Sequence, residues 1–262
     1  VNTFANPLNV EMADIPAKGV IEIEKVDAET AESVAVEGIG FSVYADEDVA
    51  TADGTVRVLK DELVAKVATD AAGTARTPEL YPGRYRVVET SAPEGYVVDR
   101  SPREAVVPYV DGETPVSVCR TSMPDAPQKG VIEITKVDAE TGRIVPFAAK
   151  FDVVAADDVV TPDGTVRAAA GDVVATVETD ERGRAETGEL YLGSYDVYER
   201  RAPEGYVLNG EPVVANLDYA GQHVAVTSAS TVVGDVPQKG VIEVAKVDAE
   251  TGRAIPAAGT AF

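Results

Sequence analysis

A short segment occurs three times in this chain at a nearly constant spacing, and no other feature limits the possible folds as much. KGVIEIEKVDAET at 18–30 returns as KGVIEITKVDAET at 129–141 and as KGVIEVAKVDAET at 239–251. The segment ELYPGRYRVVETSAPEGYVV at 79–98 likewise returns, as ELYLGSYDVYERRAPEGYVL at 189–208. A period of about 110 residues is the size of a domain with one core. The sequence therefore predicts tandem copies of one small fold.

The two ends of the chain match the ends of these repeats. VEMADIPAKG at 10–19 aligns with TSMPDAPQKG at 121–130, where one repeat finishes and the next begins. The third copy stops at Phe262, level with Phe41 and Phe151. We therefore expect a last strand of a preceding repeat, two complete domains and a first strand of a following repeat, at 1–17, 18–127, 128–238 and 239–262 respectively.

Within each repeat, runs of four to eight residues alternate between apolar and polar side chains, as in half-buried strands. Glycine turn signals separate them, because glycine tolerates positive φ. The clearest turns are Asp53-Gly54, Pro82-Gly83, Asp111-Gly112 and Asp163-Gly164. No stretch has a convincing helical period. The prediction is an all-β chain of tandem Greek-key β-sandwich domains.

Composition excludes several classes of function. The net charge of -22 repels phosphate backbones and anionic lipid heads, so neither nucleic acid nor a membrane is an expected partner. The single histidine, His223, rules out histidine triads and multi-histidine metal sites, and we expect it on a surface strand. The lone Cys119 is interpreted as a packed or idle thiol. Asp46-Glu47-Asp48 and Asp157-Asp158 lack EF-hand spacing and are interpreted as solvated loops. No metal and no cofactor is expected.

A lysine occupies the core face of the first predicted strand. Residues two apart in a strand share a face, so Ile21, Ile23 and Lys25 point one way. Glu22 and Glu24 point the other way. The apolar stripe therefore ends in a charged side chain.

Two carboxylates follow the same pattern. Glu89 aligns with Tyr85 and Val87 on a later strand, and Asp125 aligns with Met123 on the last one. The second repeat has Lys136, Glu199 and Asp235 at the matching positions.

Burying these three charges separately would be very costly, and two interpretations remain open. One is a buried ion pair or triad, which stabilises a fold only weakly. The other is chemical, because desolvation favours the neutral forms of lysine and of a carboxylic acid. A neutral amine is a nucleophile, and a protonated glutamate can act as a general acid and base. Amide formation with loss of water then becomes feasible in the folded domain.

The chain resembles a known family. K-V-D on the first strand, L-Y-P-G-x-Y-x-V-x-E-T-x-A-P-E-G-Y at 80–96 and a terminal D-x-P are similar to the CnaB-type (SpaA, prealbumin-like) domains of Gram-positive adhesins and pilins. The resemblance covers almost the whole chain and implies a reverse immunoglobulin-like sandwich. It also implies an isopeptide bond from a first-strand lysine to a last-strand Asn or Asp, assisted by a glutamate.

Carried over by position, the resemblance implies cross-links Lys25–Asp125 and Lys136–Asp235, with Glu89 and Glu199 as the catalytic residues. The usual family residue at the third position is Asn, whereas this chain has Asp and would release water instead of ammonia. Asp14 and Lys246 hold cross-link positions whose partners would belong to neighbouring repeats.

These observations predict structural stalk or shaft modules of an extracellular, cell-wall-attached adhesin or pilin of a Gram-positive bacterium. Its partners would be neighbouring repeats of the chain and, through a distal tip, host extracellular matrix. No enzyme activity is expected beyond a single-turnover bond formation. The alternative is a module whose own loops bind a host matrix protein or glycan, or an accessory domain of an enzyme. Nearly equal spacing in the two copies favours a spacer.

Overall fold

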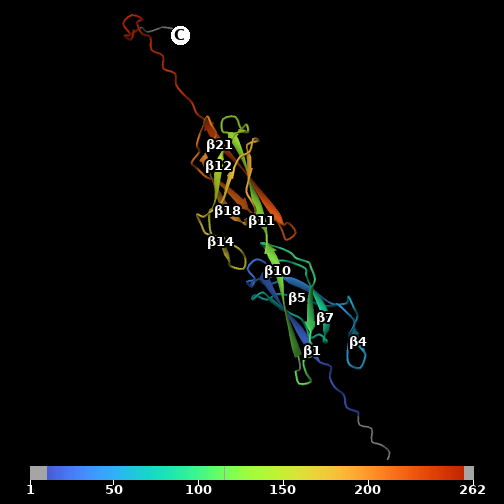
Figure 1. Ribbon diagram of the computed structural model, residues 1–262. Coiled ribbons are helices and arrows are strands. Elements are labelled where there is room, and N and C mark those ends of the chain that lie inside the picture. Colours follow the sequence, from blue (N-terminus) through green and yellow to red (C-terminus); the bar gives the residue numbers. More distant parts are fainter. Residues whose placement is uncertain (1–10, 115, 257–262) are drawn as a thin grey trace, which may run out of the picture.

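The computed structural model describes residues 11–114 and 116–256, and it consists of two β-sandwiches joined end to end (Figure 1). The blue N-terminal and red C-terminal segments leave at opposite ends, which makes the molecule an elongated rod. In the described ranges, no helix is long and apolar enough to cross a membrane. The predicted class of tandem all-β sandwiches is confirmed.

The first sandwich packs two four-stranded sheets face to face. One sheet has the order β6-β1-β10-β8 and the other the order β5-β2-β7-β9, while β3 and β4 form a small hairpin beside them. The strands are β1 (Lys18–Asp27), β2 (Gly40–Ala45), β3 (Val49–Ala50), β4 (Val56–Val58), β5 (Leu63–Ala68), β6 (Thr74–Arg76), β7 (Gly83–Glu89), β8 (Tyr96–Val97), β9 (Arg103–Val107) and β10 (Val116–Pro127).

The second sandwich repeats this arrangement. Its sheets have the orders β16-β11-β21-β19 and β15-β12-β18-β20, with β17 also paired to β11 and a β13-β14 hairpin. The strands are β11 (Lys129–Asp138), β12 (Lys150–Ala155), β13 (Val159–Val160), β14 (Val166–Ala168), β15 (Val173–Glu178), β16 (Arg184–Glu186), β17 (Leu190–Tyr191), β18 (Gly193–Arg201), β19 (Tyr206–Val207), β20 (Val213–Leu217) and β21 (Val226–Pro237).

The first and last strands of each domain lie side by side and run parallel. β1 pairs with β10 from Lys18 opposite Val116 to Asp27 opposite Asp125, without a register shift. The closing strand therefore keeps its parity through Pro124, and Met123 and Asp125 both face inward. β11 and β21 pair in the same way. This pairing brings residues about a hundred positions apart into one layer.

Each domain has its own apolar core between the two sheets. Alternation puts every second side chain inside, as in β7, where Tyr85, Val87 and Glu89 are buried. The first core consists of Ile21, Ile23, Ile39, Phe41, Val43, Ala45, Val49, Ala65, Ala75, Leu80, Tyr85, Val87, Ala105, Val107 and Met123. The second consists of Ile132, Ile134, Ala149, Phe151, Val153, Ala155, Val159, Ala185, Tyr195, Val197, Ala215, Leu217 and Val233.

The predicted glycine turns divide into two kinds. Gly54 and Gly164 have φ of 81° and 85°, the left-handed region that favours glycine. Gly83 differs, because it begins β7 with an ordinary φ. A Cβ there would lie 2.9 Å from Cγ2 of Val49, so this glycine permits close packing of the β3–β4 hairpin.

The chain beyond the two sandwiches forms no strand where the structure describes it. Residues 1–10 and 257–262, which belong to the two expected partial repeats, lie outside the described residues. Residues 239–246 repeat the sequence of β1 but are extended, with Val241 90% and Ile242 89% exposed. A single strand without neighbours to pair with has no sheet in which to bury its apolar face.

Thr77→Val tests the edge of the first sheet. The buried Thr77 hydroxyl accepts a 2.9 Å hydrogen bond from the Ile21 amide, and valine would leave this buried N–H without a partner. We expect the first domain to lose about 1–3 kcal/mol of unfolding free energy in denaturant titration. Ser122→Ala, an exposed position on β10 whose side chain points away from the core, is the control and should change stability by less than about 0.5 kcal/mol.

Candidate functional site

Lys25 lies near the end of β1 with its side chain inside the first sandwich. It follows Ile21 and Ile23 on the inward face, and its side chain is 0% exposed. The ammonium nitrogen Nζ lies 3.0 Å from Oε2 of Glu89 and 2.8 Å from Oδ2 of Asp125. A buried lysine therefore meets both carboxylates that strand parity placed on the core face.

The three residues come from three strands of both sheets. Glu89 ends β7 and lies opposite Phe41 of β2 in the facing sheet. Asp125 lies on β10, two positions beyond Met123, which is the register partner of Lys25. The Asp99 amide donates a 3.0 Å hydrogen bond to Oδ1 of Asp125. The site is complete only when both sheets have packed.

The contact between Lys25 and Asp125 is close without being a hydrogen bond. Lys25 donates a hydrogen bond to Glu89, but its approach to Asp125 lacks hydrogen-bond geometry despite the short distance. Within the described chain, Oδ2 of Asp125 and Oε1 of Glu89 are buried and have no hydrogen-bond partner. The lysine amine thus lies within contact distance of the one oxygen of Asp125 that accepts no hydrogen bond.

The second domain builds the same triad. Nζ of Lys136 lies 3.0 Å from Oε1 of Glu199 and 2.6 Å from Oδ1 of Asp235, and all three side chains are fully buried. The hydrogen bonds of the two triads differ, since Lys25 donates one to Glu89 whereas the contacts of Lys136 with both carboxylates lack hydrogen-bond geometry. The Asn209 amide donates to Glu199 at 3.4 Å, whereas the corresponding amide of Asp99 donates to the aspartate.

Burial sets the protonation of the glutamates. Desolvation is the main cause that raises the pKa of Glu89 to about 8; Lys25 opposes this shift and the neighbouring Asp125 carboxyl supports it. Burial likewise raises the pKa of Glu199. Near neutral pH the first triad therefore contains a protonated Glu89 beside an amine and a second carboxyl group.

That protonation state is suited to amide formation. A lysine ammonium paired with an aspartate carboxylate carries the same number of protons as a neutral amine beside a carboxylic acid. One proton transfer within the pocket therefore produces a nucleophile and a neutral electrophile without any proton from solvent. The protonated glutamate remains available as the general acid.

The other residues that the sequence analysis considered do not form part of either triad. Asp14 and Lys246 are both exposed; Asp14 lies in the segment before β1 and Lys246 in the segment after β21. His223 is exposed, but it lies in a turn before β21, so the expected strand position is wrong; its Nε2 lies 3.4 Å from Nε2 of Gln222. Cys119 is half-buried and packs against the first core.

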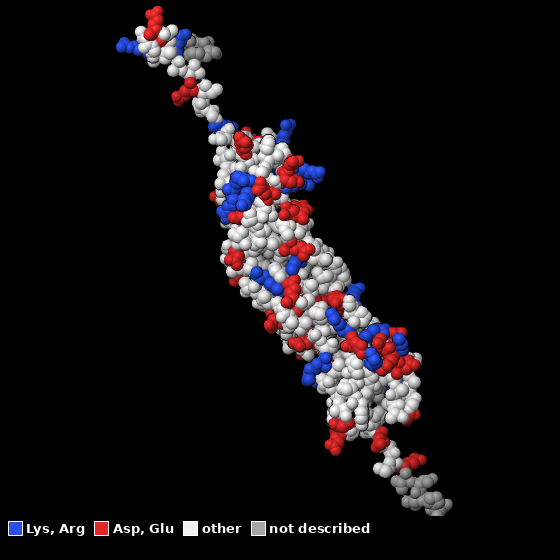
Figure 2. All heavy atoms as spheres, in the orientation of Figure 1, with Lys and Arg blue, Asp and Glu red and all other residues white. Residues whose placement is uncertain are grey.

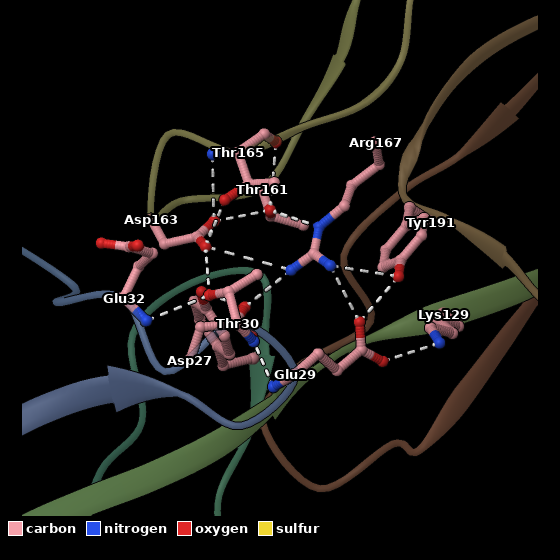
Figure 3. Close-up of polar contacts among 11 residues, drawn as sticks. Asp27, Glu29, Thr30, Glu32, Lys129, Thr161, Asp163, Thr165, Arg167 and Tyr191 are labelled. Carbon is pink, nitrogen blue, oxygen red and sulfur yellow. Dashed lines mark hydrogen bonds and ion pairs between the residues drawn. The ribbon is translucent and has the colours of Figure 1, made fainter.

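Sequence reasoning missed a second polar cluster, which lies between the domains. Asp27 and Glu29 of the first domain contact Arg167 and Tyr191 of the second (Figure 3). A signal was present, since D-A-E-T and D-G-T-V-R both recur with the repeat period. By itself, D-G-T-V-R indicates only a turn.

Comparison with known proteins identifies the fold of both halves. The family model described as the SpaA prealbumin-like fold domain matches residues 19–119 and 130–231. The solved Bacillus anthracis TIE protein is 26% identical, with a TM-score of 0.52, over 84% of this chain and 34% of that one. No curated protein matches significantly.

Two solved pilins are also similar. A streptococcal ancillary pilin is 24% identical over 84% of this chain and 62% of its own length, with a TM-score of 0.32. GBS52, the minor pilin of Streptococcus agalactiae, is 15% identical over 87% of this chain and 100% of its own, with a TM-score of 0.34. The chain thus spans 34% of the Bacillus anthracis protein and 62% of the streptococcal one.

Asp125→Ala should strongly destabilise the first domain. It leaves the buried Lys25 with one carboxylate instead of two, and loss of one partner from a buried ion pair costs about 3–5 kcal/mol. Glu104→Ala is the matched control, because its pair with Arg84 is about half exposed and contributes less than about 1 kcal/mol. Equal losses of unfolding free energy in the two variants would contradict a buried, interdependent triad.

Proposed function

This chain belongs to the SpaA prealbumin-like fold domains, and we propose that its two repeats are shaft modules of a Gram-positive surface adhesin or pilin, each locked by an intramolecular Lys–Asp isopeptide bond. The observation that carries the proposal is the fully buried triad of Lys25, Glu89 and Asp125, repeated as a second complete triad in the other domain. Two unrelated structural salt bridges would have no need of an acid with a raised pKa beside each pair.

The bond forms in one turnover. Neutral Nζ of Lys25 attacks Cγ of Asp125, and a C–N bond forms as the carbonyl opens to a tetrahedral intermediate. Glu89 gives its proton to the departing hydroxyl group, the C–O bond breaks and one water molecule leaves. The glutamate then takes a proton from the nitrogen, which restores its starting state. Fixed positions within a dry core supply the high effective concentration that such a condensation needs.

The location of the bond fits a load-bearing role. Lys25 and Asp125 belong to the first and last strands of the domain, and force applied at the two ends of the rod enters and leaves through these strands. A bond between them carries tension past the core. As a cross-link across a loop of about 100 residues, it also stabilises the fold by roughly 4–5 kcal/mol in the chain-entropy model.

The rest of the proposal follows from this role. The chain acts as a spacer outside the cell, attached to the wall through other parts of its protein, with neighbouring repeats as its direct partners and host matrix reached through a distal tip. It performs no catalysis beyond forming its own two bonds. The described loops have nearly equal lengths in the two domains, which favours a spacer over a loop-based matrix or glycan receptor.

Intact-protein mass spectrometry tests the bonds directly. The purified chain should weigh two water molecules less than its sequence mass. Glu89→Gln keeps the shape of the side chain but removes its acidic proton, so this variant should regain one water, and Glu199→Gln should regain the other. Peptide mapping should find Lys25 joined to Asp125 and Lys136 joined to Asp235. A wild-type mass equal to the sequence mass would rule out the covalent proposal and leave salt bridges.

The rate of bond formation should fall as pH rises through about 8. The folded-state pKa of Glu89, about 8, lies above its ordinary value of 4.5, so the glutamate is protonated below about pH 8 and loses its proton above it. The chain would be recovered in denaturant before it has folded, with a mass equal to its sequence mass, then diluted into buffers between about pH 6 and 10 and quenched for mass spectrometry. An increase in rate above pH 8 would contradict an acid role for Glu89.

A further inference from the structure

The two domains are held together by a polar interface in which Arg167 is central. This arginine extends from β14 of the second domain, and its guanidinium group lies 3.0 Å from Oδ2 of Asp27 and 3.1 Å from Oε2 of Glu29 in the first domain (Figure 3). Lys129 and the Tyr191 hydroxyl also bind Glu29, at 2.8 and 2.6 Å. The cationic groups of Lys129 and Arg167 both lie over the Tyr191 ring.

The turn that carries Arg167 is itself part of this interface. Asp163 accepts hydrogen bonds from Thr161 and Thr165 and a further one, 3.0 Å long, from Thr30 of the first domain. The Asp163 side chain is 0% exposed and that of Arg167 is 10% exposed. An acidic Asp-Ala-Glu-Thr turn of one repeat thus fits into a cationic and aromatic face of the next. We call these two surfaces the acidic turn and the basic face.

A second layer of contacts closes the interface. The side chain of the buried Gln128 donates a hydrogen bond to the Gly221 carbonyl and accepts one from the Ala220 N–H. The backbone N–H of Gln128 donates to the Gly95 carbonyl of the first domain. A Cβ on Gly95 would lie only 2.9 Å from Cγ of Pro162 in the other domain.

The first domain carries the same basic face at its outer end. Asp53 accepts hydrogen bonds from Thr51 and Thr55 at 2.6 and 2.8 Å, and Arg57 donates to Thr51 at 3.0 Å, as in the second domain. Lys18 lies 3.1 Å from the centroid of the Tyr81 ring, and Arg57 lies over the same ring. The arrangement of the side chains is therefore already that of the occupied interface.

This outer face is open where its counterpart is covered. The Asp53 side chain is 60% exposed and that of Arg57 is 33% exposed. A groove of about 580 Å³ lies beside them, lined by residues 14–17 of the segment before β1 and by Pro82 and Tyr109, and Tyr109 is 65% exposed. In the described chain, the ion pair formed by Arg57 is with Asp53 of its own turn, at 3.8 Å.

The second domain carries the acidic turn at the opposite end of the rod. Asp138 accepts hydrogen bonds from the amides of Glu140 and Thr141 at 2.9 and 2.8 Å, which gives the same turn geometry as Asp27. One contact of the interface is already present there, because Lys239 binds Glu140 at 2.7 Å as Lys129 binds Glu29. The molecule thus has complementary surfaces at its two ends.

We propose that the basic face of the first domain, formed by Lys18, Asp53, Arg57 and Tyr81, is a docking site for the acidic turn of another repeat of this kind, and that a second copy of this chain can occupy it end to end. Arg57 would bind Asp138 and Glu140 of the incoming copy, and Lys18 would take the place of Lys239. The contact is head to tail, so it leaves one basic face and one acidic turn open and can propagate. It does not depend on the isopeptide bonds.

The outer site lacks the second layer of the occupied interface. Ala17 stands where the linker of the second domain has Gln128, and Ala52 stands where it has Pro162. The docking energy must therefore come mainly from the charged and aromatic contacts. The association should weaken as salt screens those charges.

Sedimentation velocity on two complementary variants tests the proposal. Arg57→Glu disables the basic face and leaves the acidic turn, while Glu140→Arg does the reverse. The wild-type chain should form species that lengthen with concentration, and each variant alone should associate at least about tenfold more weakly, because like charges then meet. An equimolar mixture should associate again, because the intact acidic turn of one variant then meets the intact basic face of the other.

Arg76→Glu is the matched control, since it makes the same change of charge at an exposed arginine on β6, away from both ends. It should associate as the wild type does, and thermal melting should show that all variants are folded. A wild-type chain that stays monomeric up to about 1 mM would overturn the proposal. So would a mixture that fails to dimerise, or a loss with Arg76→Glu equal to that with Arg57→Glu.

Discussion

The parallel pairing of the first and last strands is the constraint on which the rest of the structure depends. It aligns β1 with β10 over ten residues and brings Lys25 beside Asp125 in a layer that the other sheet covers. Glu89 completes the group from that covering sheet. Because no one of the three could be buried alone at acceptable cost, the fold and the triad require each other.

Burial of the triad costs free energy, and the same burial shifts the pKa of Glu89. Removal of water raises the pKa of Glu89 to about 8, so an acid remains protonated where a surface glutamate would be charged. It also leaves polar atoms of the aspartate and glutamate without hydrogen-bond partners within the described chain. A purely structural salt bridge would be expected to satisfy those atoms. The unsatisfied atoms are those that condensation would consume or use.

The contacts between the two domains are mainly polar, whereas those within each domain core are apolar. The cores are apolar and belong to single domains, whereas the part of the interface around Arg167 is built from charges, hydroxyl groups and the Tyr191 ring. Figure 2 shows charged side chains of both signs distributed over the rod between white, uncharged surfaces. Specific polar contacts at the ends of such domains fix how one repeat follows another without exposing a large apolar patch when an end is open.

The sequence alone determined the repeat, the all-β class and the inward direction of Lys25, Glu89 and Asp125, because these depend on a fixed period and on the alternation of side chains along a strand. It could not show that the three meet, since that depends on which strands pair and which sheet covers them. The interface around Arg167 was hidden for the same reason. Its motifs lie more than a hundred residues apart, and only the stacking of two folded domains joins an acidic turn to the face that binds it.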